Sequence, residues 1–124
     1  MQFSISRENL LKPLQQVCGV LSNRPNIPVL NNVLLQIGDN RLTITGTDLE
    51  VELSSQTQLS SSSENGTFTI PAKKFLEICR TLSDDSEITV TFEQDRALVQ
   101  SGRSRFTLTT QPAEEYPNLT DWQS

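Results

Sequence analysis

Apolar and polar residues alternate at the start of the chain, and the same alternation returns just past its middle. Met1 to Ser6 alternates with the period of two that is typical of a half-buried strand. Ser6 can then cap a helix, in which apolar residues recur at the spacing of one face, namely Leu10, Leu14, Val17, Cys18 and Leu21. Pro13 lies inside this pattern, so we expect the helix to bend or weaken there.

A second strand and helix begin at Thr67. Thr67 to Ile70 is strand-like, and Pro71 suits the first helical position. The core side of the helix that follows is formed by Ala72, Phe75, Leu76, Cys79 and Leu82. Three strand-like runs follow each helix: Val33 to Ile37, Leu42 to Thr47 and Leu49 to Leu59 after the first, and Glu87 to Phe92, Arg96 to Ser101 and Arg103 to Thr110 after the second. The sequence therefore predicts an α+β domain of two β-α-β-β-β repeats, with two helices packed on antiparallel sheets.

Three segments show neither the alternation of a strand nor the apolar spacing of a helix. Ser22 to Pro28 carries two prolines and predicts a stiff loop around Arg24. Ser60 to Gly66 is a polar connection between the two repeats. Gln111 to Ser124 contains two prolines and a buried-looking Trp122, and it reads as a strap or a linker that continues into further chain. In the run from Leu49, the apolar residues Leu49, Val51 and Leu53 are expected to face one side.

Composition and charge narrow the class of protein. A chain of 124 residues is the size of one domain, and no apolar run approaches the ~20 residues of a membrane span. The strand-like alternation directly after Met1 is unlike a secretory signal, so we expect a cytoplasmic location. The net charge of −5 argues against a protein that holds nucleic acid by charge alone. Six of the ten basic residues nevertheless fall between Lys73 and Arg105.

The residue types argue against an enzyme. The chain has no histidine, which removes the usual general base and the commonest metal ligand. Cys18 and Cys79 lack the spacing of a metal or disulfide pair and are expected to be small buried side chains. We therefore expect no cofactor. Acidic residues such as Asp84 and Asp85 stand on predicted turns, where solvation explains them, although a hydrolase that works through carboxylates is an alternative.

The second helix carries two lysines where a cation costs free energy. Lys73 and Lys74 lie in its first turn, beside the positive end of the helix dipole. Relative to an acidic residue there, each lysine should cost up to about 0.3–1 kcal/mol of stability. Lys74, Ile78 and Leu82 form a ridge along one edge of the core face, whereas Lys73, Glu77 and Arg80 share the wetter face. A ridge available to a partner and an ordinary wide core stripe explain the pattern equally well.

The last predicted hairpin mixes cations with apolar residues in the same way. In SGRSRF, Arg103 and Arg105 point to one side of the strand, Phe106 points to the other, and Arg96 comes from the neighbouring strand. If this strand is a sheet edge, its free backbone groups are a template for another strand, and flanking cations select an acidic partner. An arginine row that merely protects the edge from aggregation is the competing explanation.

Five stretches together resemble one known family over the whole chain: ENLLKPLQQVCGVLSNRPNIPVLNNVLLQ, LTITGTDLEVEL, IPAKKFLEICR, SGRSRFTL and YPNLTDWQS. They are similar to the first domain of the bacterial sliding clamp, the beta subunit of DNA polymerase III. In that family three domains of one fold form half of a ring, and two chains joined head to tail encircle duplex DNA. The resemblance implies that residues 1–124 are the first domain and that a second and a third domain follow.

The resemblance also implies roles for single residues. Arg24 resembles the family's contact to duplex DNA, and Lys12, Lys73 and Arg80 would contribute to the positive inner wall. The first-domain side of the ring interface would be formed by Lys74, Ile78, Leu82, Arg96, Arg103, Arg105 and Phe106.

These roles imply a processivity clamp that is not an enzyme. A ring holds duplex DNA by topology, independently of sequence, and needs only weak phosphate contacts, which fits an acidic chain. DNA polymerase III and the clamp loader would bind through the domains beyond Ser124. The alternative from another class is a small protein-interaction module that uses the exposed edge strand.

Overall fold

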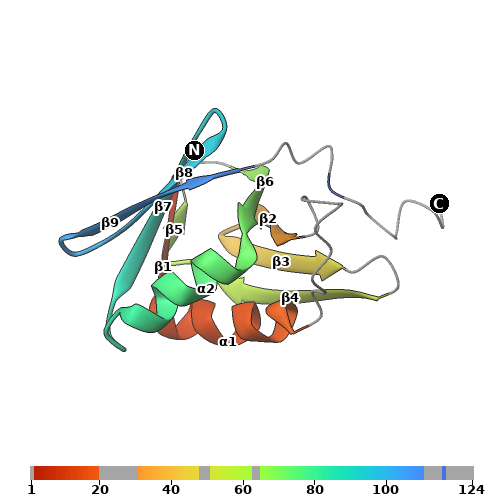
Figure 1. Ribbon diagram of the computed structural model, residues 1–124, viewed down its shortest axis with the longest axis horizontal. Helices are drawn as coiled ribbons and strands as arrows, with labels where there is room; N and C mark the ends of the chain where they lie inside the picture. The colour runs from red at the N-terminus through yellow and green to blue at the C-terminus, as the bar shows by residue number, and fades with distance from the viewer. Residues whose placement is uncertain (1, 20–30, 48–50, 63–64, 111–115, 117–124) are drawn as a thin grey trace.

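The computed structural model describes residues 2–19, 31–47, 51–62, 65–110 and 116 (Figure 1). The first repeat consists of β1 (Gln2–Ser6), α1 (Arg7–Cys18), β2 (Asn32–Gly38), β3 (Arg41–Thr47) and β4 (Glu52–Gln58). The short strand β5 (Ser61–Ser62) follows. The second repeat consists of β6 (Gly66–Pro71), α2 (Ala72–Thr81), β7 (Glu87–Glu93), β8 (Arg96–Ser101) and β9 (Ser104–Thr109). The predicted order β-α-β-β-β is therefore confirmed in both halves.

The two repeats exchange their first strands. The strands form one antiparallel sheet in the order β5-β1-β7-β8-β9 and a second in the order β4-β3-β2-β6. Strand β1 pairs with β7, where Phe3 lies opposite Val90, and β6 pairs with β2, where Phe68 lies opposite Leu35. Each sheet needs strands from both halves of the sequence, so the two repeats form one domain.

One hydrophobic core joins both sheets and both helices. Every second residue of the central strands faces it, which is why Ile5, Ile44 and Val99 are fully buried. The helices lie side by side in Figure 1 and contact each other. Their buried residues are Leu10, Pro13, Leu14 and Val17 on α1 and Ala72, Phe75, Leu76, Ile78 and Cys79 on α2. The predicted core sides are confirmed at Leu10, Leu14 and Val17 and at Ala72, Phe75, Leu76 and Cys79. Cys18, which was predicted to be buried, is only half-buried.

The start of α1 agrees with the sequence, whereas the start of α2 differs. Leu21, which was predicted on the apolar face of the first helix, lies outside the described residues. Ser6 caps α1, because its side chain accepts a hydrogen bond from the backbone N–H of Asn9 at 3.2 Å. The helix then continues through the buried Pro13 to Cys18. Pro71 was predicted at the first helical position, but it is the last residue of β6 and has extended backbone angles (φ −60, ψ 117). Its missing N–H costs nothing there, because the chain turns into the helix only at Ala72.

Two further expectations are corrected between the repeats. Val51 was expected on the apolar side of a strand, but it is 53% exposed because β4 begins one residue later. The connection at 60–66 was expected to be a polar loop, but its described part includes β5, in which Ser61 pairs with Ser4 of β1. Leu59, just before it, is buried at 3% exposure and holds this segment to the core.

The expected strap after β9 is described at one residue, Tyr116, which is 6% exposed. Its hydroxyl donates a hydrogen bond to the carbonyl oxygen of Thr45 on β3 at 3.2 Å. Trp122, which we expected to be buried, lies outside the described residues.

Candidate functional site

The helix pair positions the cations that were predicted to face DNA. The two helices run antiparallel, since the Cys18 thiol at the end of α1 donates to the carbonyl oxygen of Ala72 at the start of α2, at 3.8 Å. At the other end, the Arg7 guanidinium at the start of α1 donates to the carbonyl oxygen of Cys79 near the end of α2. Lys12, Lys73 and Arg80 are all exposed on this pair.

Lys73 and Arg80 act electrostatically on the end of α1. Burial raises the pKa of the Cys18 thiol, and the positive charges of Arg80 and Lys73 partly oppose that rise. Both cations are therefore within electrostatic reach of one point on the neighbouring helix. Lys73 and Arg80 therefore belong to the exposed surface of α2 near the end of α1.

Lys12 has different surroundings. It lines a groove of about 710 Å³ between α1 and the segment that follows α2, together with Arg7, Glu8, Leu11, Gln15, Asp84 and Asp85. Three of these neighbours are carboxylates, so the positive charge of Lys12 is partly offset. Arg24, the predicted contact to duplex DNA, lies outside the described residues.

A second groove lies between α2 and β9, the edge strand of the five-stranded sheet. It has a volume of about 540 Å³ and is lined by Lys74, Glu77, Ile78, Thr81, Arg105, Phe106, Thr107 and Leu108. Four of the seven residues predicted for the ring interface therefore meet in one place: Lys74, Ile78, Arg105 and Phe106. Ile78 is only 7% exposed, so most of its surface belongs to the core and only its rim is open to a partner.

The edge strand separates its charged and apolar side chains. Arg105 lies opposite Gln100 on β8, and the next residue, Phe106, lies opposite the buried Val99. When the Gln100 side-chain amide is oriented with its oxygen toward Arg105, that oxygen accepts hydrogen bonds from Nη2 and Nε of Arg105 at 3.1 and 3.2 Å. Arg105 is thereby held across the outer face of the sheet while Phe106 packs toward α2, as the alternation predicted.

Three predicted interface residues lie apart from the groove. Leu82 was placed on a helical ridge, but it follows the last residue of α2 in extended conformation, because the helix ends at Thr81. Arg103 was placed on the last strand, but it lies in the turn at Gly102, whose positive φ of 56° starts the hairpin bend. Arg96 pairs with Thr109 at the opposite end of the hairpin, about 13 Å along the strand from the level of Arg105.

Leu82 still borders the same side of the domain. It lines a neighbouring hollow of about 450 Å³ with Thr81, Ser101, Gly102 and Ser104, next to the turn that carries Arg103. Thr81 lines both the hollow and the groove. The predicted residues at 82, 103 and 105 therefore belong to one continuous side of the molecule, from which Arg96 is more distant.

Comparison with known proteins decides the family. Residues 1–120 match the family described as DNA polymerase III beta subunit, N-terminal domain. The chain belongs to this family. It is 97% identical over 124 residues to the beta sliding clamp of Haemophilus influenzae and 54% identical to that of Escherichia coli, and in each case it covers 34% of the relative's length.

Solved structures of beta subunits have the same fold. A sliding clamp from Pseudomonas aeruginosa bound to griselimycin superimposes with a TM-score of 0.92 at 49% identity, over 96% of this chain and 32% of that one. The Caulobacter crescentus beta subunit gives a TM-score of 0.91 at 36% identity, over 96% and 32%. The clamp fold predicted from the sequence is confirmed, and the chain spans about a third of the beta subunits that it matches.

Within this beta-subunit domain, sequence reasoning assigned no role to three residues that the structure makes prominent. Glu77 and Thr107 line the groove beside β9, and Arg7 joins the two helices. The signal for Arg7 was present but weak, because a cation directly after the capping Ser6 is disfavoured by the helix dipole unless it has another partner. Among the described residues, no group of three or more Cys, Asp or Glu could hold a metal ion. The described helices also include none that is long and apolar enough to cross a membrane.

Proposed function

We propose that this chain is the first of three domains of a sliding-clamp subunit, and that two such subunits form a ring around duplex DNA. The observation that carries the proposal is the groove beside β9. An edge strand, two cations and a half-exposed Phe106 stand together there, at a surface of the size and chemistry that another domain can cover.

The partner at this groove would be the last domain of a second subunit, bound head to tail. Strand β9 pairs with β8 on one side, so its other side can accept a strand and extend the sheet across the boundary. Lys74 and Arg105 favour an acidic partner edge, and Arg103, Arg96 and Leu82 would extend the contact at its margins. Burial of Phe106 by the partner would contribute hydrophobic stabilisation.

The helical side of the domain would face the DNA. Lys73, Arg80 and Lys12 would touch phosphate groups, with Arg24 as a further contact, and we expect no base readout by them. Weak contacts suit this role, because a ring that held phosphates tightly would resist sliding. The carboxylates around Lys12 keep the contact weak at that end of the helix pair.

The ring would act as a tether and not as an enzyme. DNA polymerase III and the clamp loader would bind the domains beyond Ser124, and the tether would keep the polymerase at a high effective concentration near the primer end. We propose the cytoplasm as the place of action.

The test uses the full-length chain loaded onto nicked circular DNA. The ring should remain on the circle through gel filtration and should be lost when the DNA is linearised, since only topology holds it. The 124-residue chain by itself should be monomeric and should not remain on either DNA. Retention of the isolated domain on circular DNA would contradict encirclement.

A further inference from the structure

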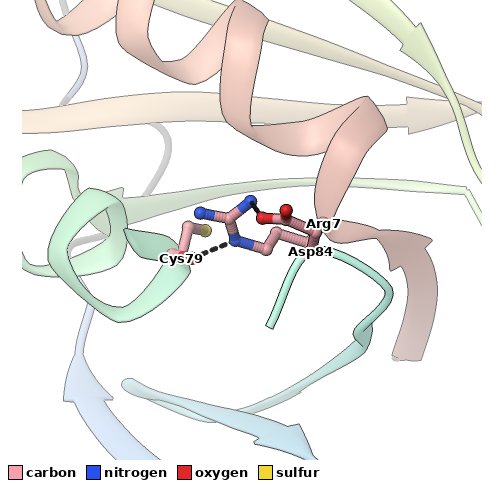
Figure 2. A network of polar contacts seen from close by, with 3 residues as sticks. All are labelled: Arg7, Cys79 and Asp84. Carbon is pink, nitrogen blue, oxygen red and sulfur yellow. Dashed lines mark hydrogen bonds and ion pairs between the residues drawn. The ribbon is translucent and has the colours of Figure 1, made fainter. Parts of the chain in front are cut away.

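Arg7 is the first residue of α1, and its guanidinium is directed toward the end of α2 (Figure 2). Its Nε donates to the carbonyl oxygen of Cys79 at 2.6 Å, and its Nη1 lies 2.9 Å from Oδ1 of Asp84. Its backbone N–H donates to the carbonyl oxygen of Ser86 at 2.9 Å. One residue therefore holds the end of α2 and the segment after it against the start of α1.

The bond to Cys79 is the stronger of the two side-chain contacts. The Arg7 side chain is 14% exposed, whereas that of Asp84 is 94% exposed, so water screens the ion pair from one side. The Cys79 carbonyl belongs to the last turn of α2, where the helix dipole is negative and a cation is favoured. A charged donor to a buried acceptor makes one of the stronger hydrogen bonds in a protein.

Among the described residues, the polar contact at the opposite end of the helix pair is weaker. It joins the thiol of Cys18 to the carbonyl oxygen of Ala72 at 3.8 Å, and a thiol is a poor donor. Of these two contacts between the helices, the one from Arg7 is better able to fix how far α2 is displaced along α1.

The position of α2 matters on both of its exposed sides. One side carries Lys73 and Arg80, and the other contributes Lys74 and Ile78 to the groove beside β9. Because a helix moves as a rigid element, a shift of its C-terminal end changes the distance from Ile78 to Phe106 across the groove.

We propose that Arg7 is a positioning residue of the ring interface: through the Cys79 carbonyl it holds α2 at the spacing from β9 that the partner subunit requires. This inference rests on the proposed function, because it needs the groove to be the subunit contact. Arg7 itself does not line that groove, so its effect on the partner would be indirect.

The experiment measures subunit exchange in the full-length chain, using dimers labelled with two fluorophores, at a temperature where every variant is folded. Arg7→Ala and Arg7→Lys are compared with a variant at Ile44, a buried residue of β3 in the other sheet that does not line the groove. This control is chosen from Ile44→Val and Ile44→Ala so that its loss in Tm matches that of the Arg7 variant. Asp84→Asn tests the exposed ion pair separately.

We expect Arg7→Ala to exchange at least about tenfold faster than the Ile44 variant of equal Tm, because a displaced α2 no longer fits the partner and changes at an interface act mainly on dissociation. Arg7→Lys, which keeps the positive charge and an N–H donor group, should recover part of that difference, and Asp84→Asn should change the rate by less than about threefold. Equal rates for Arg7→Ala and the Ile44 variant would overturn the positioning role, and if Arg7→Ala does not fold, the same comparison is made with Arg7→Lys. A wild-type chain that stays monomeric would instead overturn the proposed function, and this inference with it.

Discussion

The rings of Phe68 and Phe92 stack with their centroids 4.0 Å apart and their planes 8° from parallel. Phe68 belongs to β6 of the four-stranded sheet and Phe92 to β7 of the five-stranded sheet. The stacked pair therefore joins the two sheets at the point where the repeats have exchanged strands.

Phe68→Ala should lower the free energy of unfolding by about 2 kcal/mol, less than for a fully buried phenylalanine because Phe68 is partly exposed. Urea unfolding followed by circular dichroism measures this loss. Phe68→Leu, which keeps most of the apolar surface, should cost clearly less. Equal losses for the two variants would contradict this expectation, because they would assign the whole cost to the lost ring and none to the lost apolar surface.

Alkaline pH should destabilise the domain, because two buried groups must stay protonated in the folded state. Burial raises the pKa of the Cys79 thiol from 9.0 to about 12, against an opposing effect of the Arg7 charge. Burial likewise raises the pKa of Tyr116 from 10.0 to about 12. A raised folded-state pKa means that the unfolded chain loses its proton first, so stability is full below about pH 9 and falls between pH 9 and 12.

Urea midpoints measured between pH 8 and 11 check this pH dependence. Cys79→Ala should flatten the decline above pH 9, because its thiol can no longer ionise on unfolding. An unchanged slope in that variant would assign the decline to other groups.

Charge reversal at the edge strand should open the proposed ring. The double variant Arg103→Glu and Arg105→Glu replaces attraction for an acidic partner edge with repulsion, so the full-length chain should shift toward monomer in sedimentation velocity. Arg41→Glu is the matched control, since Arg41 is also exposed but begins β3 in the other sheet. A dimer that survives the double reversal would remove both arginines from the interface.

Arg24→Ala should weaken DNA binding with little effect on folding. The loss should be largest at low salt, and it should reduce the dependence of affinity on salt concentration, since one phosphate contact disappears. Fluorescence anisotropy with a duplex across a salt series, alongside a thermal melt, provides both readings. DNA affinity at low salt that equals wild type would refute this role.

Lys73 and Lys12 should differ in their contribution to DNA binding. Lys73→Ala is expected to weaken binding more than Lys12→Ala, because Lys12 shares its groove with Glu8, Asp84 and Asp85. Asp85→Asn should then increase affinity by exposing the charge of Lys12. The same anisotropy assay ranks the three variants, and an equal effect of the two lysines would contradict the electrostatic difference between the two sites.

The sequence by itself determined the two helices and the order of the strands other than β5, because local interactions control them. Alternation at residues 1–6 and helical spacing from Leu10 to Cys18 act over a few residues, and the Ser6 cap is satisfied by its near neighbour Asn9. The alternation along β9 likewise suffices to put Arg105 and Phe106 on opposite faces of the sheet. Family resemblance, and not periodicity, assigned their roles.

Tertiary structure alone decided what depends on contacts between distant residues. The exchange of β1 and β6 between sheets is invisible in the sequence, since both strands have the same local pattern and only the packing of two repeats selects their partners. The groove between α2 and β9, the end of α2 before Leu82 and the separation of Arg96 from Arg105 follow from that packing. The hydrogen bond from Arg7 to the Cys79 carbonyl also follows from that packing, because the two residues are 72 positions apart in the chain.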